Sequence, residues 1–213
     1  MNPLKPVALL TAGVTLALTP LAAAEAKSQN WPAFRGLGAT GVAEGYSLPT
    51  TWNADPAAGK TSGVLWRTPV PGLGHSSPVV WADRIFLCTA IAEDGKSSLK
   101  LGPGGRPTAA DDSGKHSWVV LCYDKSTGKE LWRKTARQGK PRATRHVKAS
   151  QANTSLAVDG KHLVAFFGSE GLYCYDLDGN LLWSRDLGVI NISKYGIGWG
   201  YASSPAIHGN HIA

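Results

Sequence analysis

Apolar residues of this chain fall in short runs that are separated by Gly, Asp and Asn. Val, Ile, Leu, Tyr and Trp are frequent in these runs, and no long stretch repeats its apolar positions with the roughly 3.6-residue period of a helix. Short runs that are bounded by turn residues are typical of β-strands. The pattern therefore predicts an all-β architecture.

Two stretches of the sequence are close copies of each other. Residues 120–132 read VLCYDKSTGKELW, and residues 172–183 read LYCYDLDGNLLW. In each copy an Asp ends one apolar run, a Gly follows, and a second apolar run carries Leu-Trp, which also occurs at 65–66. An Asp side chain accepts hydrogen bonds from a turn backbone, and Gly adopts the positive φ of a tight turn. Each copy therefore predicts a β-hairpin.

A second landmark precedes each hairpin, a run of Ser, Thr or Asn that leads into apolar residues and a turn. Another apolar strand follows the turn, so one repeat comprises four strands. Both faces of these strands are apolar, and each sheet must be covered on both sides, as the blades of a β-propeller are. The aligned runs are 76–80, 153–157 and 203–207, and the strands after the turns are 84–88, 162–167 and 211–213.

The repeats define a predicted organisation. We expect a signal peptide at 1–24, an N-terminal extension at 25–63 and an incomplete propeller of about two to three blades at 64–213. Propellers close with about 4–8 blades, so the sequence indicates a fragment whose free strand edges associate. An outer strand at 64–69 would pair with the last blade of a complete ring. The blade repeats are about 70–135, 146–187 and, incomplete, 197–213.

The first repeat is longer than the second. Pro78 and Trp132 are 54 residues apart, whereas Ser155 and Trp183 are 28 apart, an excess of 26. The extra residues lie at about 92–117, where Gly and Pro are frequent. We expect a long surface loop there, either facing a partner or simply tolerated as an insertion.

The first 24 residues have the composition of a secretory signal. Lys5 is followed by an uncharged apolar stretch and by small residues at 21–24. The stretch is shorter than the about 20 apolar residues of a membrane span, and Pro20 interrupts it. The protein is expected to be exported to the periplasm or the cell exterior, without a transmembrane span after cleavage. An uncleaved anchor is the alternative.

The net charge of +7 is concentrated in one segment, 129–148, where Glu130 alone opposes eight basic residues. Such a run is usually solvated, and an anionic partner such as a polysaccharide is the alternative. Nucleic acid is not expected, because no aromatic residues interleave a basic face. The basic residues are Lys129, Arg133, Lys134, Arg137, Lys140, Arg142, Arg145 and Lys148.

Cys88, Cys122 and Cys174 are too few and too widely spaced for a disulfide framework or a zinc site. Each lies in an apolar strand pattern, so a small buried side chain is the simplest interpretation. A Cys122–Cys174 disulfide is the alternative, since an exported chain meets an oxidising compartment.

Residues 122–132 resemble the tryptophan-docking repeat of pyrroloquinoline-quinone-type β-propellers, which reads a small residue, Asp or Asn, Thr-Gly, three residues and Trp. Residues 30–36 with Gly41, and residues 166–176 and 198–205, are similar to an exported bacterial group of the same family. The resemblance covers nearly all of 30–213 and implies an all-β propeller of four-stranded blades.

In that family the Trp docks on the turn region of the adjacent blade. The resemblance thus implies structural roles for the matching repeat residues here. An indole buries about 150–250 Å2, and the substitution Trp183→Ala is expected to cost about 3–5 kcal/mol. The repeat residues are Trp66, Asp124, Thr127, Gly128, Trp132, Asp176, Gly179 and Trp183.

Two functions follow from the resemblance. One is a non-catalytic exported module that binds or scaffolds a protein or carbohydrate partner, as a barrel-assembly lipoprotein of the family scaffolds assembly proteins; its lipid-bearing cysteine is missing here. The other is part of an alcohol or sugar dehydrogenase that binds pyrroloquinoline quinone and calcium. Such enzymes carry a pair of adjacent cysteines and a carboxylate-rich site, neither of which the sequence contains. The binding module is favoured, and no catalytic residue, cofactor or metal ligand is assigned.

If an axial site exists, its residues should lie just before or within the inner strands, where side chains from several blades converge at one channel mouth. His75, His146 and His208 lie next to these strands, although a satisfied structural histidine is the simpler interpretation of each. The axial candidates are His75, Ser76, Lys148, Gln151, Asn153, Trp199 and Ser203.

Overall fold

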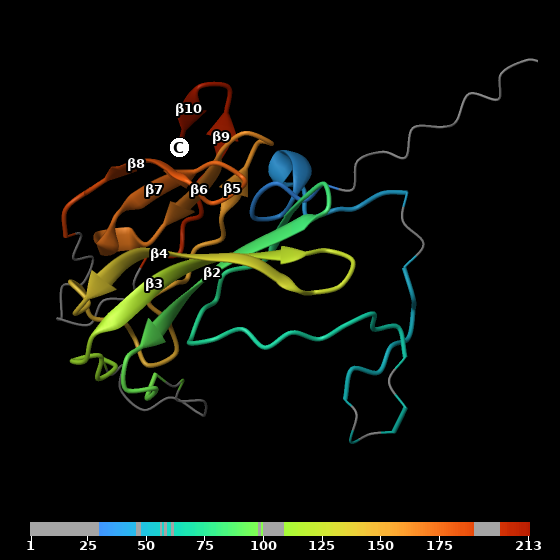
Figure 1. Cartoon of the computed structure of the whole chain (residues 1–213), viewed down its shortest axis with the longest axis horizontal. Helices are drawn as coiled ribbons and strands as arrows, with labels where there is room; N and C mark the ends of the chain where they lie inside the picture. The colour runs from blue at the N-terminus through green and yellow to red at the C-terminus, as the bar shows by residue number, and fades with distance from the viewer. Residues whose placement is uncertain are drawn as a thin grey trace, which may run out of the picture.

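The computed structural model describes residues 30–45, 48–55, 57, 59–60, 62–97, 99, 109–189 and 201–213. The predicted signal peptide at 1–24 and Trp199 lie outside these residues. The described residues form two four-stranded antiparallel sheets and a hairpin (Figure 1). The strands are β1 Val79–Trp81, β2 Arg84–Ala92, β3 His116–Asp124, β4 Glu130–Gly139, β5 Ala157–Val158, β6 Leu163–Phe166, β7 Leu172–Tyr175, β8 Leu181–Arg185, β9 Ile207–His208 and β10 His211–Ile212, and the short 3-10 helices are η1 Leu37–Ala39 and η3 Gly168–Glu170.

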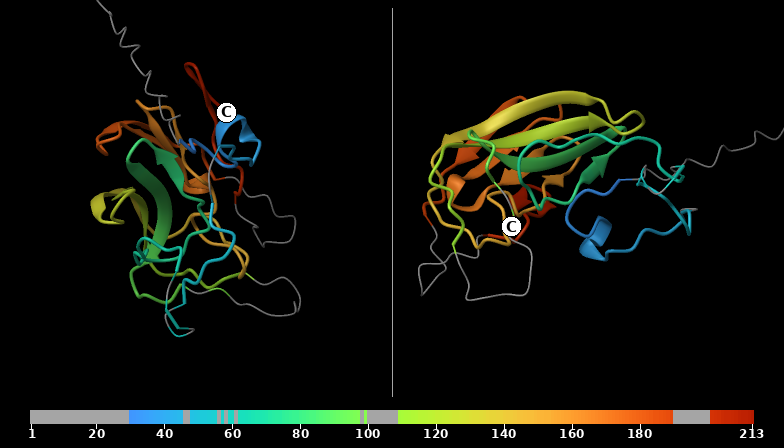
Figure 2. Two further views of the ribbon diagram at one scale, coloured as in Figure 1. Left: turned by 90° about the vertical axis from the view of Figure 1, so that its right-hand side faces the viewer. Right: turned by 90° about the horizontal axis from the view of Figure 1, so that it is seen from below.

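The sheets have the strand orders β1-β2-β3-β4 and β5-β6-β7-β8, and we name them blade 1 and blade 2. They pack face to face (Figure 2). The larger cluster of buried side chains draws on both sheets and includes Phe86, Trp118 and Leu163. The hairpin of β9 and β10 begins a third unit. The prediction of an all-β, incomplete propeller of four-stranded antiparallel blades is therefore confirmed.

The outer strand expected at 64–69 would pair with the last blade of a complete ring, and that pairing stays a prediction. In the described part of the chain, 64–69 form no ladder with blade 1 or blade 2. The segment is held farther along, where Leu73 bridges Ala90 and Thr89 donates a hydrogen bond to the Pro71 carbonyl at 2.8 Å.

The alignment of the inner strands is wrong by one residue in the second repeat. Val80 pairs with Ile85 and Val158 pairs with Leu163, so Ser77 corresponds to Ser155 rather than to Thr154. The turns themselves have the same length, since Ile85 follows Val80 by five residues and Leu163 follows Val158 by five, so 160–161 corresponds to 82–83. Equivalent positions also bond across blades: the Ser77 amide donates to Ser155 Oγ at 3.0 Å, and the Ser155 amide donates to Ser204 Oγ at 2.9 Å.

Part of the expected N-terminal extension at 25–63 belongs to the propeller body. Trp31 forms a two-way backbone bridge with Val80, at 2.8 and 2.9 Å, and the Val158 amide donates to the Pro32 carbonyl at 2.8 Å. The segment thus joins the inner strands of blades 1 and 2. The chain then turns back at Gly36, whose φ is 72° and where an added Cβ would lie 2.6 Å from the Trp31 ring.

The long loop of the first repeat lies between β2 and β3 and covers 93–115, of which 98 and 100–108 are outside the described residues. The predicted 92–117 is slightly too long, because β2 continues to Ala92 and β3 begins at His116. Glu93 donates its amide hydrogen to the Lys115 carbonyl at 2.9 Å, and this bond closes the base of the loop.

All three cysteines are free and buried, so the alternative Cys122–Cys174 disulfide is not formed. Cys122 on β3 and Cys174 on β7 occupy equivalent positions of successive blades, paired with Trp132 and Trp183. Burial raises the pKa of Cys88 and of Cys122 to about 12, and that of Cys174 to about 11. The thiols are therefore small core side chains without thiolate character near neutral pH.

Candidate binding site

Tryptophan docking joins successive units at one end of the sheets. The Trp66 indole donates to the Lys125 carbonyl at 3.0 Å, and the Trp132 indole donates to the Leu177 carbonyl at 3.0 Å. The rings lie against Gly128 and Gly179, where an added Cβ would be 2.3 Å from Trp66 and 3.0 Å from Trp132. Both glycines have positive φ, so the turns need them for backbone conformation as well as for space.

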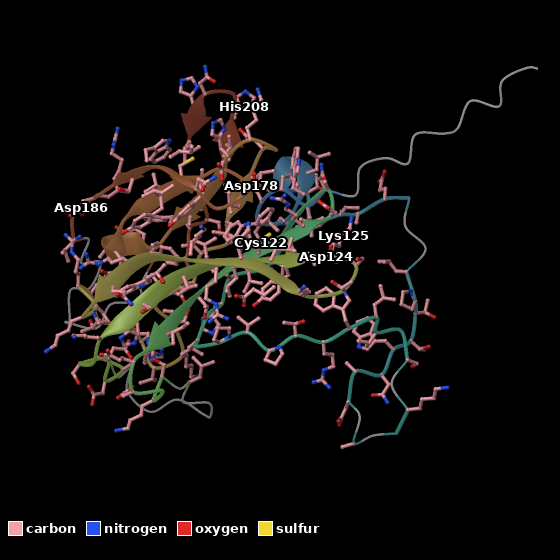
Figure 3. The ribbon with its side chains drawn as sticks, viewed as in Figure 1. Cys122, Asp124, Lys125, Asp178, Asp186 and His208 are labelled. Atoms are coloured by element: carbon pink, nitrogen blue, oxygen red, sulfur yellow. The ribbon has the colours of Figure 1, made fainter. Side chains whose placement is uncertain are left out.

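The Asp at the start of each turn organises the turn backbone. Asp124 Oδ1 accepts hydrogen bonds from the hydroxyl and amide groups of both Ser126 and Thr127, at 2.6–3.0 Å. Asp176 does the same with the Asn180 amide and side chain, both at 2.8 Å. Figure 3 shows Asp124 and Lys125 together at this end of the sheets, far from Asp186 at the other end.

We expect stability to fall at acid pH through Asp124. Hydrogen bonds from the side chain of Ser126, then from Thr127, hold the pKa of Asp124 at about 2, below its ordinary 3.8. Because the pKa is depressed in the folded state, the stabilisation is complete above about pH 4 and is lost as the pH falls towards 2. Thermal melting at pH 2–7 should show a shallower acid decline for Asp124→Asn. Asp111→Asn is the control, since Asp111 accepts one long bond, from Ser113 at 3.3 Å, and an unchanged slope in Asp124→Asn would contradict the expectation.

The basic run at 129–148 is not a free cationic surface. Four of its arginines form ion pairs, with N–O distances of 2.5–2.9 Å, and the exposed arm of Arg133 pairs within its own strand. The case for an anionic partner is therefore weaker, because it rested on an unpaired cationic surface. The pairs are Arg133–Glu130, Arg137–Glu170, Arg142–Asp186 and Arg145–Asp112.

The opposite end of the sheets carries a second group of polar residues, which we call the loop face. It consists of 93–97 and 109–115 from the long loop together with 140–156 between β4 and β5. Two backbone links hold these segments together: the Ala110 amide donates to the Arg145 carbonyl at 2.8 Å, and Ala109 bridges His146. The long loop is therefore attached to the connection between the blades rather than extending freely.

A buried ion pair lies at the centre of the loop face. Arg145 donates from Nε and Nη2 to the two oxygens of Asp112, at 2.7 and 3.0 Å, and from Nη1 to the Ala149 carbonyl at 2.6 Å. Gln151 donates to Asp112 Oδ2 at 2.9 Å. The side chains of Arg145 and Asp112 are 3% and 6% exposed, so the charges neutralise each other away from solvent.

His116 completes the cluster. Its Nδ1 lies 3.1 Å from the Gly114 carbonyl, which can only accept, so Nδ1 carries the proton. In the neutral ring Nε2 then accepts from the Ser97 hydroxyl at 3.2 Å. An open cavity of about 460 Å3 lies over these residues, with Asp94, Lys96, Asp111 and Ser113 in its walls. The polar groups of the cluster are hydrogen-bonded within it. The cavity walls carry both acidic and basic side chains.

The axial candidates separate into two groups. His75 Nδ1 lies 3.0 Å from Asn153 Oδ1, and Ser76 Oγ accepts from the Cys88 amide at 3.3 Å, so three candidates meet at the inner strands. Gln151 instead faces Asp112. His75, Lys148 and Ser203 are exposed, and Trp199 lies outside the described residues. His146 is buried and His208 is exposed on β9.

Sequence reasoning missed Asp112 and Glu170, and it named Arg145 only as part of the basic run, without its buried partner. Glu170 is 3% exposed and accepts from Arg137 Nε at 2.5 Å and from the Arg142 amide at 2.6 Å. None of the three belongs to a repeated motif, and their partners are about thirty residues away in sequence. The basic run was the one available signal, because so many arginines between two blades require counter-charges.

Four-stranded sheets, repeated at a regular interval and joined by tryptophans that dock on Asp-to-Gly turns, define a β-propeller of quinoprotein-type repeats. A family model described as outer membrane protein assembly factor BamB matches residues 28–188 and again 115–212. The two matches span nearly the whole chain, and the protein belongs to this family of repeat propellers. No curated protein matches the chain.

Proposed function

We propose that the protein is an exported, non-catalytic propeller that binds or scaffolds a protein partner. The observation that carries this proposal is that the buried charges at the loop face are paired. Asp112 accepts from Arg145, and Glu170 accepts from Arg137 and from the Arg142 amide. Loops held rigidly by buried ion pairs present a fixed surface, which is what a scaffold requires. The family description, an assembly factor, supports a protein rather than a carbohydrate partner.

The residues present do not fit the alternative cofactor. In the part of the chain that the structure describes, no group of three or more His, Cys, Asp or Glu side chains is placed to hold a metal ion. Asp112 and Glu170 already accept from arginines, and Asp124 and Asp176 accept from their own turns. A calcium ion prefers several carboxylate and carbonyl oxygens together, so calcium with pyrroloquinoline quinone has no site among these carboxylates.

Site-specific photo-crosslinking in intact cells of the source organism tests the proposal. We expect a crosslinker at Lys96 or Ser113, on the wall of the loop-face cavity, to give one discrete protein adduct. A crosslinker at Lys129, at the opposite end of the sheets, is the matched control and should give none of that adduct. Crosslinking that yields no adduct from either loop-face position would contradict the proposal.

A titration of the purified protein with calcium and pyrroloquinoline quinone tests the dehydrogenase alternative. We expect no saturable change in quinone absorbance and no dye reduction with primary alcohols or aldoses. Quinone-dependent turnover would overturn the non-catalytic assignment.

Export is part of the proposal and rests on residues 1–24. None of the helices in the described residues has the length and apolar character needed to cross a bilayer. Fractionation of cells should place the protein in the periplasm or the medium, shortened by about 24 residues as judged by N-terminal sequencing.

A further inference from the structure

Two buried histidines lie at the loop face, where the blades meet. His116 is the first residue of β3, and His146 lies in the connection between β4 and β5. The two residues are 3% and 6% exposed. Imidazole is the side chain whose charge ordinarily changes between pH 5 and 8, so buried histidines can make a surface sensitive to pH.

The ring of His146 accepts a hydrogen bond that only a neutral imidazole can accept. The Lys148 amide donates to His146 Nδ1 at 3.1 Å. A backbone amide only donates, so Nδ1 carries a lone pair here. Two further bonds close the same turn: the Ala149 amide donates to the His146 carbonyl at 2.9 Å, and Arg145 donates to the Ala149 carbonyl at 2.6 Å. Protonation of Nδ1 therefore breaks one of the three bonds that fold 145–149.

The ring of His116 holds both ends of the long loop, 93–97 and 109–115, which we call the loop stems. Its Nδ1 donates to the Gly114 carbonyl at 3.1 Å, and its Nε2 accepts from the Ser97 hydroxyl at 3.2 Å. Gly114 and Ser97 belong to different stems. In an imidazolium both nitrogens donate, so protonation would end the bond that Ser97 makes as a donor.

The two histidines act on the same stem from opposite sides. Ala109 bridges His146, and the Ala110 amide donates to the Arg145 carbonyl at 2.8 Å, so the turn at 145–149 holds the stem 109–115 against the connection between the blades. His116 holds that stem from β3. Loss of either contact loosens the attachment of the long loop.

A positive charge on these rings would be poorly compensated. Asp112 Oδ1 lies 4.0 Å from His116 Nε2, but both oxygens of this carboxylate already accept from Arg145, and Oδ2 also accepts from Gln151. A buried charge is costly unless a counter-charge pairs with it. Protonation would add a cation to a cluster whose charges are balanced while the rings are neutral.

The other charged groups around the rings do not supply a buried counter-charge. On β4, Arg137 lies over the ring of Trp118, which neighbours His116, and it pairs with Glu170. The charged side chains that line the two cavities beside His116, or that follow His146, are exposed and of both signs. They are Glu93, Asp94, Lys96, Asp111, Lys115 and Lys148.

We infer that His116 and His146 form a pH-sensitive latch, which holds the loop stems on the connection between the blades while both rings are neutral and releases them when the rings are protonated. The released state binds more protons, so the held state is favoured as the pH rises. The role of the latch rests on the proposed scaffold function: the protein presents a fixed loop face at neutral pH and a loosened one in acid.

Hydrogen exchange of the purified full chain at pH 7.5 and 5.5, read by mass spectrometry and corrected for intrinsic rates, tests the latch. We expect the loop stems to exchange about tenfold or more faster at pH 5.5, since one bound proton shifts an equilibrium by up to tenfold per pH unit. The double variant His116→Gln with His146→Asn carries amides that make similar hydrogen bonds and do not titrate, so its stems should exchange slowly at both pH values. His208→Asn, at an exposed position of β9, is the control and should keep the wild-type pH dependence.

Equal corrected exchange of the wild-type stems at both pH values would overturn the inference, and so would a double variant that keeps the wild-type pH dependence. Should the double variant not fold, nitrogen-15 spectra of the wild-type imidazoles give the answer. The latch requires His146 to carry its proton on Nε2 at pH 7.5, and a proton on Nδ1 would contradict it.

The loop-face crosslink separates the latch from the scaffold function. If the Lys96 adduct forms at neutral pH while exchange is independent of pH, the latch is wrong and the scaffold function is supported. If exchange changes with pH as expected while neither Lys96 nor Ser113 gives an adduct, the latch is supported and the scaffold function is wrong.

Discussion

The substitution Trp132→Ala is expected to destabilise the protein by about 3–5 kcal/mol, as is typical of deleting a large aromatic side chain that is packed between elements. Removal of the indole breaks three contacts. The Leu177 carbonyl loses its donor, Gly179 loses the ring that packs on it, and Phe86 loses an aromatic neighbour at 5.9 Å between ring centroids. Urea unfolding monitored by far-ultraviolet circular dichroism measures the change.

Trp183→Ala is the matched comparison. The sequence alone predicts the same cost for both tryptophans, because they occupy the same place in the repeat. The structure lowers the expectation for Trp183, whose indole meets no covering turn among the described residues. We expect Trp183→Ala to cost less than half as much as Trp132→Ala. Equal costs would show that repeat position, and not the docked turn, determines the stability.

The repeat could be predicted from the sequence because each of its features is local. Asp124, Gly128 and Trp132 lie within nine residues, and the turn chemistry of Asp and Gly is encoded in the side chains themselves. The four-stranded blade followed from counting apolar runs between such turns. The register of β5 could not be predicted in the same way, since the short run of Asn, Thr, Ser and apolar residues at 153–158 can be aligned with 76–80 at either of two offsets.

The loop face could not be predicted from the sequence, for a different reason. Asp112 lies in a Gly- and Pro-rich loop that reads as solvated, and its partner Arg145 belongs to a run that reads as a cationic surface. Only the pairing of the two segments in space makes either residue buried. Likewise, a repeated landmark made His75, Asn153 and Ser203 axial candidates, but only the structure shows that His75 Nδ1 lies 3.0 Å from Asn153 Oδ1 and that both His75 and Ser203 are exposed.

The substitution Arg145→Met is expected to cost about 3–5 kcal/mol, because it leaves the Asp112 carboxylate buried without its cation. The guanidinium makes three hydrogen bonds in the native cluster, two to Asp112 and one to the Ala149 carbonyl, so the loss falls on both segments of the loop face. Urea unfolding should show the loss, and limited proteolysis should show faster cleavage within 109–115, the part of the long loop that the pair secures.

The double variant Asp112→Leu with Arg145→Met separates charge burial from loop attachment. If the cost of the single variant is mainly an unpaired buried charge, removing both charges should restore most of the stability, since apolar replacement of a buried pair is often neutral. Proteolysis within 109–115 should then stay fast, because the hydrogen bonds that attach the loop are still missing. Arg133→Ala, at an exposed pair with Glu130, is the control and should cost less than about 1 kcal/mol. A double variant as unstable as Arg145→Met would show that the hydrogen bonds, rather than the compensation of charge, hold the loop face together.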